Sequence, residues 1–235
     1  MKLNTFSITA RCERTGQLGV AVSTAVVGVG SLCPFVQSGV GAVATQSFVN
    51  PYLGIWGLEY LAQGHSAQET LELLKTRDPG LPMRQFAVVD TKGGSAAFSG
   101  KGCDGWYGHL TGPNYAVAGN MLVGSATLEA MQQSFVSTAD LSLAERLLRA
   151  LDAGQKAGGD KRGKQSAALK VYSTEQYPLL ELRVDEHPDP VTELLRVYGV
   201  AEQNLIPLLG MLPTLANPAG AFDLEDARRR GLLQD

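Results

Sequence analysis

Polar and apolar side chains alternate at the beginning of the chain, which predicts a β-strand. Between residues 5 and 13 every second side chain is apolar, and the others are Thr, Ser, Arg or Glu. Residues 14–17 have the composition of a tight turn, and residues 18–27 are rich in Val and Ala, as expected for a returning strand. The chain therefore opens with a predicted β-hairpin.

Comparable patterns predict the other elements. The small and β-branched residues of 40–48 indicate a strand that is buried on both faces. Ser66 and Glu69 form the pattern of a capping box at the start of a helix that ends near Pro79. The remaining expectations are helices at 53–63, 124–136, 141–153 and from 190, a hairpin of 85–90 with 95–99, a strand at 115–118 that Gly119 and Asn120 interrupt, strands at 166–173 and 179–185, a helix at 223–233, and loops at 28–39, 100–112 and 153–163.

The order of these elements predicts an α+β fold. Strands and helices occur in groups, whereas a doubly wound parallel sheet would show strict strand-helix alternation. We expect a four-layer αββα sandwich, in which two antiparallel sheets are flanked by helices. Residues 1–200 are assigned to this domain. Residues 201–235 are too few to bury a core of their own, so we expect an arm that packs on the domain or on a second subunit.

Composition and charge exclude several classes of partner. The 235 residues include 20 Lys and Arg against 23 Asp and Glu, a net charge of −3, and the basic runs at 161–164 and 228–230 are not interleaved with aromatic residues. We therefore expect no nucleic-acid binding. No apolar stretch reaches the length of a membrane span, and the first residues lack the apolar core of a signal peptide. The expectation is a cytoplasmic protein without membrane contact.

Cysteine and histidine usage argues against a metal site. Cys12, Cys33 and Cys103 are widely spaced and include no Cys-x-x-Cys pair, so we expect reduced, buried thiols. The three histidines lie far from other Cys or His ligands in the sequence. We expect neither a metal nor another cofactor.

The first strand carries the most informative polar face. Thr5, Ser7, Thr9 and Arg11 share one side, although both faces of a sheet inside a four-layer sandwich should be buried. One interpretation is a hydroxyl-rich wall of a cleft in which Arg11 receives an anion. The other is a strand with one face in solvent, which would alternate in the same way.

Six segments in a fixed order favour the first interpretation, a wall of a cleft. Each alone is common, but their joint occurrence over about residues 5–185 is specific. The segments are Thr5-Phe6-Ser7-Ile8 with Ala10-Arg11, Leu18-Gly19-Val20-Ala21-Val22-Ser23, Gly39-Val40-Gly41-Ala42-Val43-Ala44-Thr45-Gln46, Asn50-Pro51 with Gly57-Leu58, Gly119-Asn120-Met121-Leu122, and Gly158-Gly159-Asp160 followed by Arg162-Gly163 and Gln165-Ser166-Ala167-Ala168-Leu169. Together they resemble the bacterial and archaeal family named domain of unknown function 1028, which is assigned to the N-terminal-nucleophile (Ntn) hydrolase-like superfamily.

The resemblance implies the αββα fold and a possible amide hydrolysis. In that chemistry a Thr, Ser or Cys at the start of the chain attacks an amide carbonyl, and its own α-amine serves as general base. The pKa of an α-amine is about 7.7–8, so this base is substantially available at neutral pH. Backbone N–H groups or a side-chain amide hold the oxyanion. Thr5 occupies the matching position.

Four residues precede Thr5, so its amine is not free in the sequence as written. Three alternatives follow. The bond between Asn4 and Thr5 is cut, translation starts downstream, or the fold is used without this chemistry. Ser7, on the same strand face, is the fallback nucleophile and would need an external base.

Further candidate residues depend on the same cleft. Asp160 is expected to position the nucleophile or the substrate, and Asn120 to contact the oxyanion or the substrate, with a solvated loop and a turn as the respective structural alternatives. For the substrate we expect contacts from Ser23, Gln46, Asn50, Arg162 and Gln165. The alternative role of Gln46 and Asn50 is helix capping, and Ser23 is expected to face Ser7 across the hairpin, where a hydroxyl pair would also serve structure alone.

These observations predict a hydrolase of a small amide or peptide-like substrate, whose carboxylate Arg11 or Arg162 would receive. The alternative is a non-catalytic ligand-binding or assembly module on the same fold. Apolar residues at 205–209 and 211–212 indicate a homodimer, although they would serve equally well to cover the core of their own chain.

Overall fold

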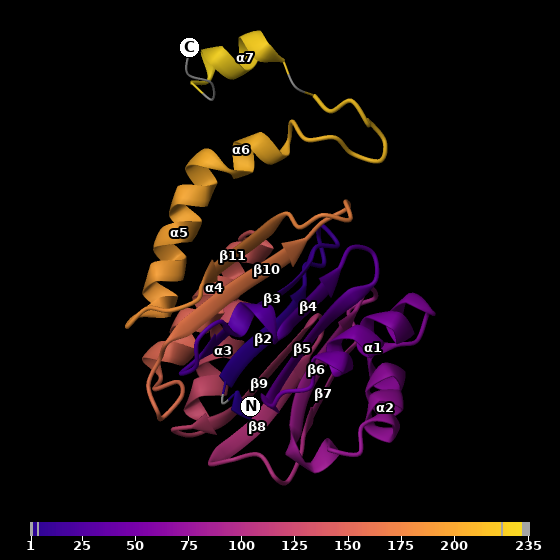
Figure 1. Cartoon of the computed structure of the whole chain (residues 1–235), viewed down its shortest axis with the longest axis vertical. Coiled ribbons are helices and arrows are strands. Elements are labelled where there is room, and N and C mark those ends of the chain that lie inside the picture. Colours follow the sequence, from indigo (N-terminus) through magenta and orange to yellow (C-terminus); the bar gives the residue numbers. More distant parts are fainter. Residues whose placement is uncertain (1, 4, 222, 232–235) are drawn as a thin grey trace. The chain divides into compact units, whose positions relative to one another are not determined.

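The computed structural model describes residues 2–3, 5–221 and 223–231 of the chain (Figure 1). It contains two compact units, Met1–Leu194 and Leu195–Asp235. The first unit holds both sheets and four of the helices. The second begins inside helix α5 (Pro190–Asn204) and contains α6 (Ile206–Leu209) and α7 (Leu224–Arg229).

One sheet of the first unit has six strands, and each neighbouring pair is antiparallel. The predicted opening hairpin lies at its centre as β2 and β3. The order across the sheet is β11 (Leu180–Val184), β10 (Ser166–Tyr172), β3 (Leu18–Thr24), β2 (Thr5–Arg11), β9 (Tyr115–Leu122) and β8 (Trp106–Gly112).

The second sheet has five strands around β5 (Gly41–Phe48). This strand is buried over seven of its eight residues, as its composition predicted. Its neighbours are β1 (Lys2–Leu3), β4 (Pro34–Gln37) and β6 (Arg84–Asp90), and β7 (Ser95–Ser99) pairs with β6.

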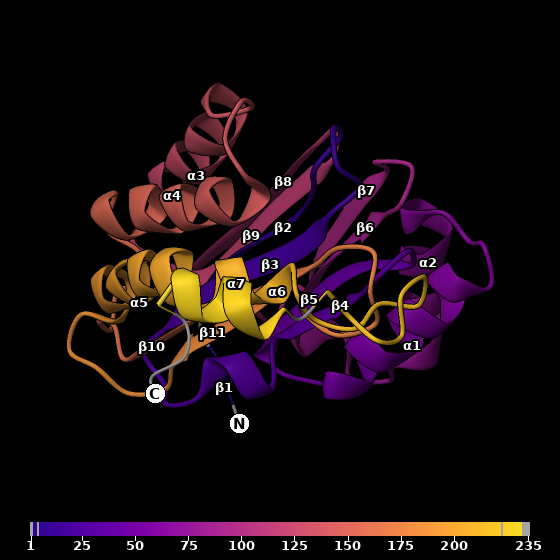
Figure 2. The same cartoon turned by 90° about the horizontal axis from the view of Figure 1, so that it is seen from above.

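Helices cover the outer faces of both sheets, which confirms the predicted α+β class and the four αββα layers. Figure 2 shows the two helix pairs on opposite sides of the sheets. Helices α1 (Pro51–Ala62) and α2 (Ala67–Arg77) cover the five-stranded sheet, and α3 (Ala126–Ser137) and α4 (Leu143–Lys156) cover the six-stranded sheet. The capping box at Ser66 is present with both of its hydrogen bonds.

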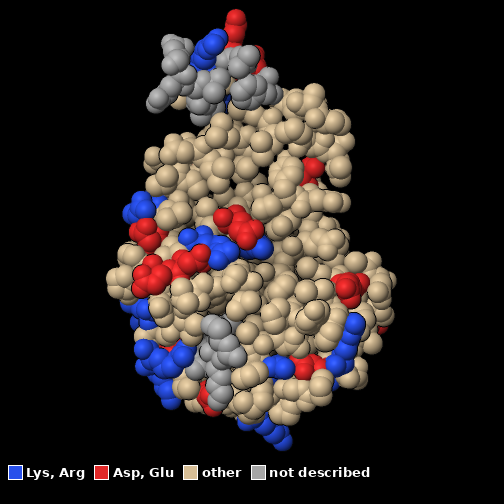
Figure 3. Space-filling model, in the orientation of Figure 1, with Lys and Arg blue, Asp and Glu red and all other residues tan. Residues whose placement is uncertain are grey.

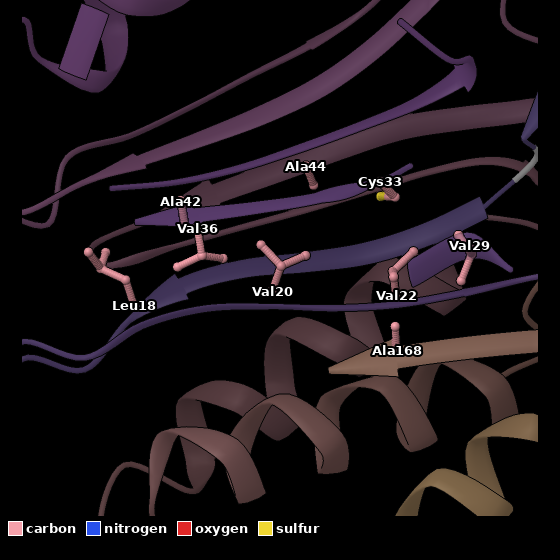
Figure 4. Packing of buried hydrophobic residues seen from close by; sticks show 9 residues of the cluster. All are labelled: Leu18, Val20, Val22, Val29, Cys33, Val36, Ala42, Ala44 and Ala168. Carbon is pink, nitrogen blue, oxygen red and sulfur yellow. The ribbon is translucent and has the colours of Figure 1, made fainter. Parts of the chain in front are cut away.

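Two clusters of buried apolar side chains occupy different spaces between the layers. Between β5, β6 and the helices α1 and α2 lies a large cluster that includes Phe86 and Leu74. Between the sheets, Val20 and Val22 of β3 pack toward Val36 of β4 and the small residues of β5 (Figure 4). This inter-sheet cluster lies on the β3, β4 and β10 side, so the space between β2, β9 and β6 is filled by other side chains.

Three expectations about local structure were wrong. Residues 106–112 form strand β8 and not a loop, because the strand pairs with β9 despite its glycines. Gly119 and Asn120 do not end β9, since the strand pairs with β8 as far as Leu122, although a shift in register follows the pair Gly108–Gly119. The Gly-rich passage after β3 contains the short strand β4, which pairs along β5.

In the second unit, the end of the helix predicted at 223–233 lies outside the described residues beyond 231. The boundary between the two units falls at residues 194 and 195, within α5, and the division of the chain at residue 200 stays a prediction.

Charged side chains are mixed in sign over the face shown in Figure 3, where Lys and Arg lie beside Asp and Glu. Ion pairs between described surface residues include Arg183–Asp185 and Lys164–Asp189. Among the described residues, no helix is both long and apolar enough to cross a membrane.

A buried carboxylate joins the ends of α1, α2 and β6. Asp78, directly after α2, accepts hydrogen bonds from Nδ2 of Asn50 (2.8 Å), from Nε of Arg84 (2.7 Å) and from the backbone N–H of Gly80 (2.7 Å). Although burial raises it, these donors hold the pKa of Asp78 below its usual value. The ionised form of Asp78 therefore stabilises the fold.

We expect Asp78→Asn to lower the free energy of unfolding by about 3 kcal/mol at neutral pH, because it removes one charge of a largely buried pair. Glu72→Gln breaks the exposed Lys75–Glu72 pair and should cost less than about 1 kcal/mol. Urea denaturation measures both.

The effect of Asp78→Asn should depend on pH. The folded pKa of Asp78 is lowered, so its contribution is fully present above the unfolded value of about 3.9 and is lost as the pH falls through the folded value. Equal losses for Asp78→Asn and Glu72→Gln at neutral pH would contradict this role.

Candidate functional site

The polar face of β2 points into the space between the two sheets. Thr5, Ser7 and Thr9 are each 0% exposed. Ser7 donates through Oγ to Oε1 of Gln46 on β5 at 2.8 Å, which fixes the direction of this face. The interpretation of β2 as a strand with one face in solvent is therefore wrong. The side chains that replace the apolar inter-sheet core here are hydroxyls and amides.

Four polar side chains form a row across the six-stranded sheet at the Thr5 end of β2. Ser166 of β10 pairs in register with Thr24 of β3, and Thr24 with Thr5. Asn120 of β9 lies one step beyond the pair Phe6–Gly119, opposite Thr5. All four are 0% exposed, and Thr5 Oγ1 donates to Thr24 Oγ1 at 3.3 Å.

The five-stranded sheet presents a matching row of Gln46, Gln85 and Ser99, which follow one another in register across β5, β6 and β7. Gln46 and Gln85 are each 0% exposed. Gln46 Nε2 donates to Oε1 of Gln85 at 2.8 Å and to the carbonyl oxygen of Thr5 at 3.4 Å. We call Thr5, Ser7, Thr24, Asn120, Gln46, Gln85 and Ser99 the inter-sheet polar layer.

Gln85 is the centre of this layer. Its Oε1 accepts from Nδ2 of Asn120 at 2.9 Å as well as from Gln46. Its Nε2 donates to Oγ of Ser99 at 2.7 Å and to the carbonyl oxygens of Gly108 and Gly119 at 3.0 and 2.9 Å. One side chain thus joins β5, β6 and β7 to β8 and β9 across the sandwich.

Of the buried side-chain atoms that lack a hydrogen-bond partner among the described residues, two lie on the inter-sheet face of the six-stranded sheet. They are Oδ1 of Asn120 and Oγ1 of Thr9. Buried polar atoms are nearly always hydrogen-bonded in folded proteins. The carbonyl oxygen of Asn120, beside Thr5, is therefore available to a ligand or to a new amine at Thr5.

The backbone is unusual directly after two of the amide residues. Ser47, after Gln46, has φ of 69°, and Met121, after Asn120, has φ of 55°. Side-chain-bearing residues seldom adopt this left-handed region, and such conformations cluster at functional sites. In the described chain the third case is Asn114, a residue type that tolerates this conformation, in the β8–β9 turn.

A family model described as "Family of unknown function (DUF1028)" matches residues 5–194 of the chain. The chain belongs to this DUF1028 family. A solved DUF1028 protein from Silicibacter pomeroyi is 30% identical, with a TM-score of 0.86, and the alignment covers 94% of this chain and 100% of that one. The family match begins at Thr5 and ends where the first unit ends.

More distant likenesses were found among structures of Anbu, the ancestral β-subunit. The structure from Yersinia bercovieri is 13% identical, with a TM-score of 0.39, and covers 89% of this chain and 99% of that one. A Gly-1 mutant from Hyphomicrobium sp. strain MC1 is 15% identical, with a TM-score of 0.41, and covers 85% and 95%. No curated protein matches the chain.

The structure of this DUF1028 chain brings together four of the residues selected from the sequence. Thr5, Ser7, Gln46 and Asn120 all belong to the inter-sheet polar layer. Arg11 does not, because it ends β2 roughly 20 Å of extended strand away from Thr5. Its Nη1 donates to Oδ1 of Asn114 at 3.0 Å.

Ser23 does not face Ser7, so that expectation is wrong. The register pairs Ser7 with Val22 and Ser23 with Phe6, and neighbouring positions on a strand point to opposite faces. Ser23 is buried on the helix-covered face. Asn50 serves as the predicted alternative, a helix cap, since Oδ1 accepts from the backbone N–H of Tyr52 and Nδ2 donates to Asp78.

The other selected residues lie in the segment that approaches β9 and β3 from the loop after α4. Asp160 forms an isolated bridge with Leu122, two residues beyond Asn120, and its buried carboxylate pairs with Arg162 at 2.7 Å. A solvated loop is therefore the wrong alternative for Asp160. Gln165 bonds to the carbonyl oxygen of Thr24 through its backbone N–H at 2.8 Å.

Three members of the polar layer were missed in the sequence. Thr24, Gln85 and Ser99 lie at strand ends, where a polar residue normally marks the exit into solvent. Gln85 stands at the start of a run of apolar residues. Its place in the polar layer could be predicted only from the register of β5 and β6, which pairs it with Gln46. Next to the layer, Nδ1 of the exposed His109 lies 2.9 Å from Oγ of Ser99.

The three cysteines are free and buried, as predicted. Burial raises the pKa of Cys33 to about 12, although a hydrogen bond from the backbone of Thr45 lowers it, and the thiol lies 3.9 Å from Oε1 of Gln46. A thiol with this pKa remains protonated at neutral pH and is a poor nucleophile. Cys33 therefore contributes to packing beside the polar layer.

We expect Gln85→Met to destabilise the fold by more than about 3 kcal/mol, because it keeps the side-chain volume but leaves several buried donors and acceptors without partners. Gln68→Met is the control, since Gln68 is exposed on α2 and bonds to Glu72 only through an i,i+4 contact. Urea denaturation compares the two variants. A loss for Gln85→Met that matches Gln68→Met would show that the network is not what holds the sheets together.

Proposed function

We propose that this DUF1028 protein is an amidohydrolase of the Ntn type, which acts on a small amide or peptide-like substrate with Thr5 as its nucleophile. The observation that carries the proposal is the position of Thr5. It opens a central strand, its hydroxyl lies in a buried polar layer, and the unpartnered oxygen of Asn120 belongs to the residue opposite. The start of the family match at Thr5 also supports it.

The chain before Thr5 belongs to the other sheet. Lys2 and Leu3 pair with Phe48 and Ser47 of β5, whereas Thr5 pairs with Thr24 of β3. Leu3 is therefore paired in one sheet and Thr5 in the other. Cleavage of the bond before Thr5 would release this short strand and leave an α-amine in the polar layer.

The nucleophile, the general base and the proton transfers of the reaction are then supplied by Thr5 and a water molecule. The α-amine takes the proton of the Thr5 hydroxyl while Oγ1 forms a bond to the acyl carbon of the substrate. The C–N bond of the amide breaks, and the departing amine receives that proton. A water molecule next gives a proton to the same α-amine and attacks the acyl ester. The bond between Oγ1 and the acyl carbon breaks, Oγ1 takes the proton from the α-ammonium group, and the carboxylic acid leaves, which restores Thr5.

The contacts of Ser7 favour Thr5 over the fallback nucleophile. The Ser7 hydroxyl donates to the amide oxygen of Gln46, and an amide oxygen is too weak a base to remove the proton. Ser7 and Gln46 instead fix the carbonyl of Thr5, to which Gln46 Nε2 donates. We assign them to positioning of the nucleophile.

The unpartnered Oδ1 of Asn120 bears on whether this residue contacts the oxyanion or the substrate. Its Nδ2 donates to Gln85, and its Oδ1 is an acceptor without a partner. An acceptor suits an N–H of the substrate, or the α-amine of Thr5, better than a negatively charged oxyanion. Asp160 and Arg162, which pair with each other near the end of β9, remain candidates for contact with the substrate.

A chain that begins at Thr5, released by a site-specific protease from a precursor, should hydrolyse members of a panel of acyl p-nitroanilides, measured by the release of p-nitroaniline. Thr5→Ser should retain activity, and Thr5→Ala should lose about a thousandfold or more because no nucleophile remains. The chain with residues 1–4 attached should be inactive.

Ser7→Ala is the matched variant, because it removes a hydroxyl from the same face of the same strand without removing the nucleophile. It should lower the rate less than Thr5→Ala does. Equal activity with and without residues 1–4, or full activity of Thr5→Ala, would exclude the proposed mechanism. No turnover by any form would favour the alternative, a ligand-binding module.

We also propose a homodimer that forms through residues 201–235, on the basis of their apolar segments. Light scattering of the full chain should give twice the mass of one subunit, and a chain that ends at residue 200 should be monomeric. An unchanged dimer after truncation would exclude the arm as the main contact.

A further inference from the structure

A second site lies at the other end of β2, where the hairpin turns of the six-stranded sheet meet α3 and α4. A cavity of about 500 Å³ opens there, a size typical of pockets for small ligands. Arg11 and Arg14 line it from the β2–β3 hairpin, and Arg146 from α4. Phe135 of α3 and Tyr115 of β9 supply aromatic surface.

Arg146 is a charged side chain that the protein buries without neutralising it. Arg146 is only 8% exposed, and its guanidinium carbon lies 3.9 Å from the centroid of the Phe135 ring. Nη2 donates to the carbonyl oxygen of Phe135 at 3.1 Å, while Nε is buried without a partner. In the described part of the chain no carboxylate forms an ion pair with Arg146.

A buried charge of this kind is expensive unless it is paired. Burial and the positive charge of Arg14 lower the pKa of Arg146, although nearby Cys12 and Asp140 oppose the effect. Its pKa nevertheless starts so high that the group stays charged at neutral pH. The cavity therefore holds a cation whose natural partner is an anion from outside the protein.

The two other arginines of the cavity, Arg11 and Arg14, bond to neutral groups, so these bonds do not neutralise their positive charge. Arg11 donates to the amide oxygen of Asn114, and Arg14 donates to the backbone carbonyls of Asp140 and Leu141, each at 2.8 Å. These partners are neutral. Glu13 is the acidic residue of the lining, and it is exposed at the hairpin turn.

We propose that this cavity binds a small monocarboxylate with an apolar body. The planar guanidinium of Arg146 matches the geometry of a carboxylate, and Arg11 lies on the same cavity to add a second contact. The apolar surface of Phe135, Tyr115 and Val136 suits the body of the ligand. Glu13 disfavours a dianion such as phosphate, because it adds a negative charge to the same lining.

This site is separate from the inter-sheet polar layer. Arg11 and Thr5 are the two ends of one strand, and Phe135, Tyr115 and Arg146 belong to the layer between the six-stranded sheet and its helices. The proposal therefore stands whether or not Thr5 is a nucleophile.

Titration of the full chain with sodium benzoate, followed by isothermal calorimetry at low ionic strength, tests the proposal. Benzoate should give saturable binding at millimolar concentrations or below, and benzamide, which has the same shape without the charge, should bind at least about tenfold more weakly. Inorganic phosphate should also bind more weakly than benzoate. Stronger binding of phosphate or benzamide than of benzoate would overturn the assigned ligand class.

Arg146→Gln and Arg11→Gln should each weaken benzoate binding by about tenfold or more, because each removes a charged donor. Arg149→Gln is the matched control, since Arg149 lies one turn further along α4, is exposed, and pairs with Glu145. Arg11 is only half-buried, so its variant remains informative if Arg146→Gln fails to fold. No saturable binding of benzoate, or equal affinity in Arg11→Gln and Arg149→Gln, would overturn the proposal.

Discussion

Two sheets that pack face to face are normally held together by apolar side chains, and in this protein that holds for only part of the contact. Around β3, β4 and β10 the inter-sheet space is filled by Val, Leu and Ala. Around β2, β9 and β6 it is filled by amides and hydroxyls, whose burial is favourable only while they bond to one another. Gln85 makes this possible, because it bonds to Gln46 on its own sheet and to Asn120 and two backbone carbonyls on the other. Gln46 and Asn120, the two amides next to Thr5, are both held by that side chain.

The inter-sheet polar layer supplies hydroxyl and amide groups that an apolar core would lack. Thr5, Ser7 and Asn120 are fixed by backbone register and by hydrogen bonds before any ligand arrives, which is the preorganisation that catalysis requires. The left-handed backbone at Ser47 and Met121 follows directly after two of the amides. The charged end of β2 is different, since Arg11 belongs to a cavity under α3 and α4. One strand thus connects two sites of different chemistry.

The sequence supported most of the fold because the strongest patterns are local. The alternation in β2, the capping box at Ser66 and the hairpin of β6 and β7 each depend on a few neighbouring residues. Strand β8 was missed, because its pairing with β9 is not visible in its own Gly-rich sequence. Thr5, Ser7 and Asn120 were found through the family resemblance and the strand period. Gln85 was missed and Ser23 was assigned to the wrong face, since both depend on the register between strands.

We propose that the hydroxyl of Thr5 becomes a nucleophile once residues 1–4 are removed. The most direct test is covalent labelling of a chain that begins at Thr5 with a fluorophosphonate, followed by intact mass and peptide fragmentation. A single adduct on Thr5, which is absent from the chain that retains residues 1–4, is the predicted result. An adduct on Ser7 or on another residue, or no adduct on the chain that begins at Thr5, would contradict the account.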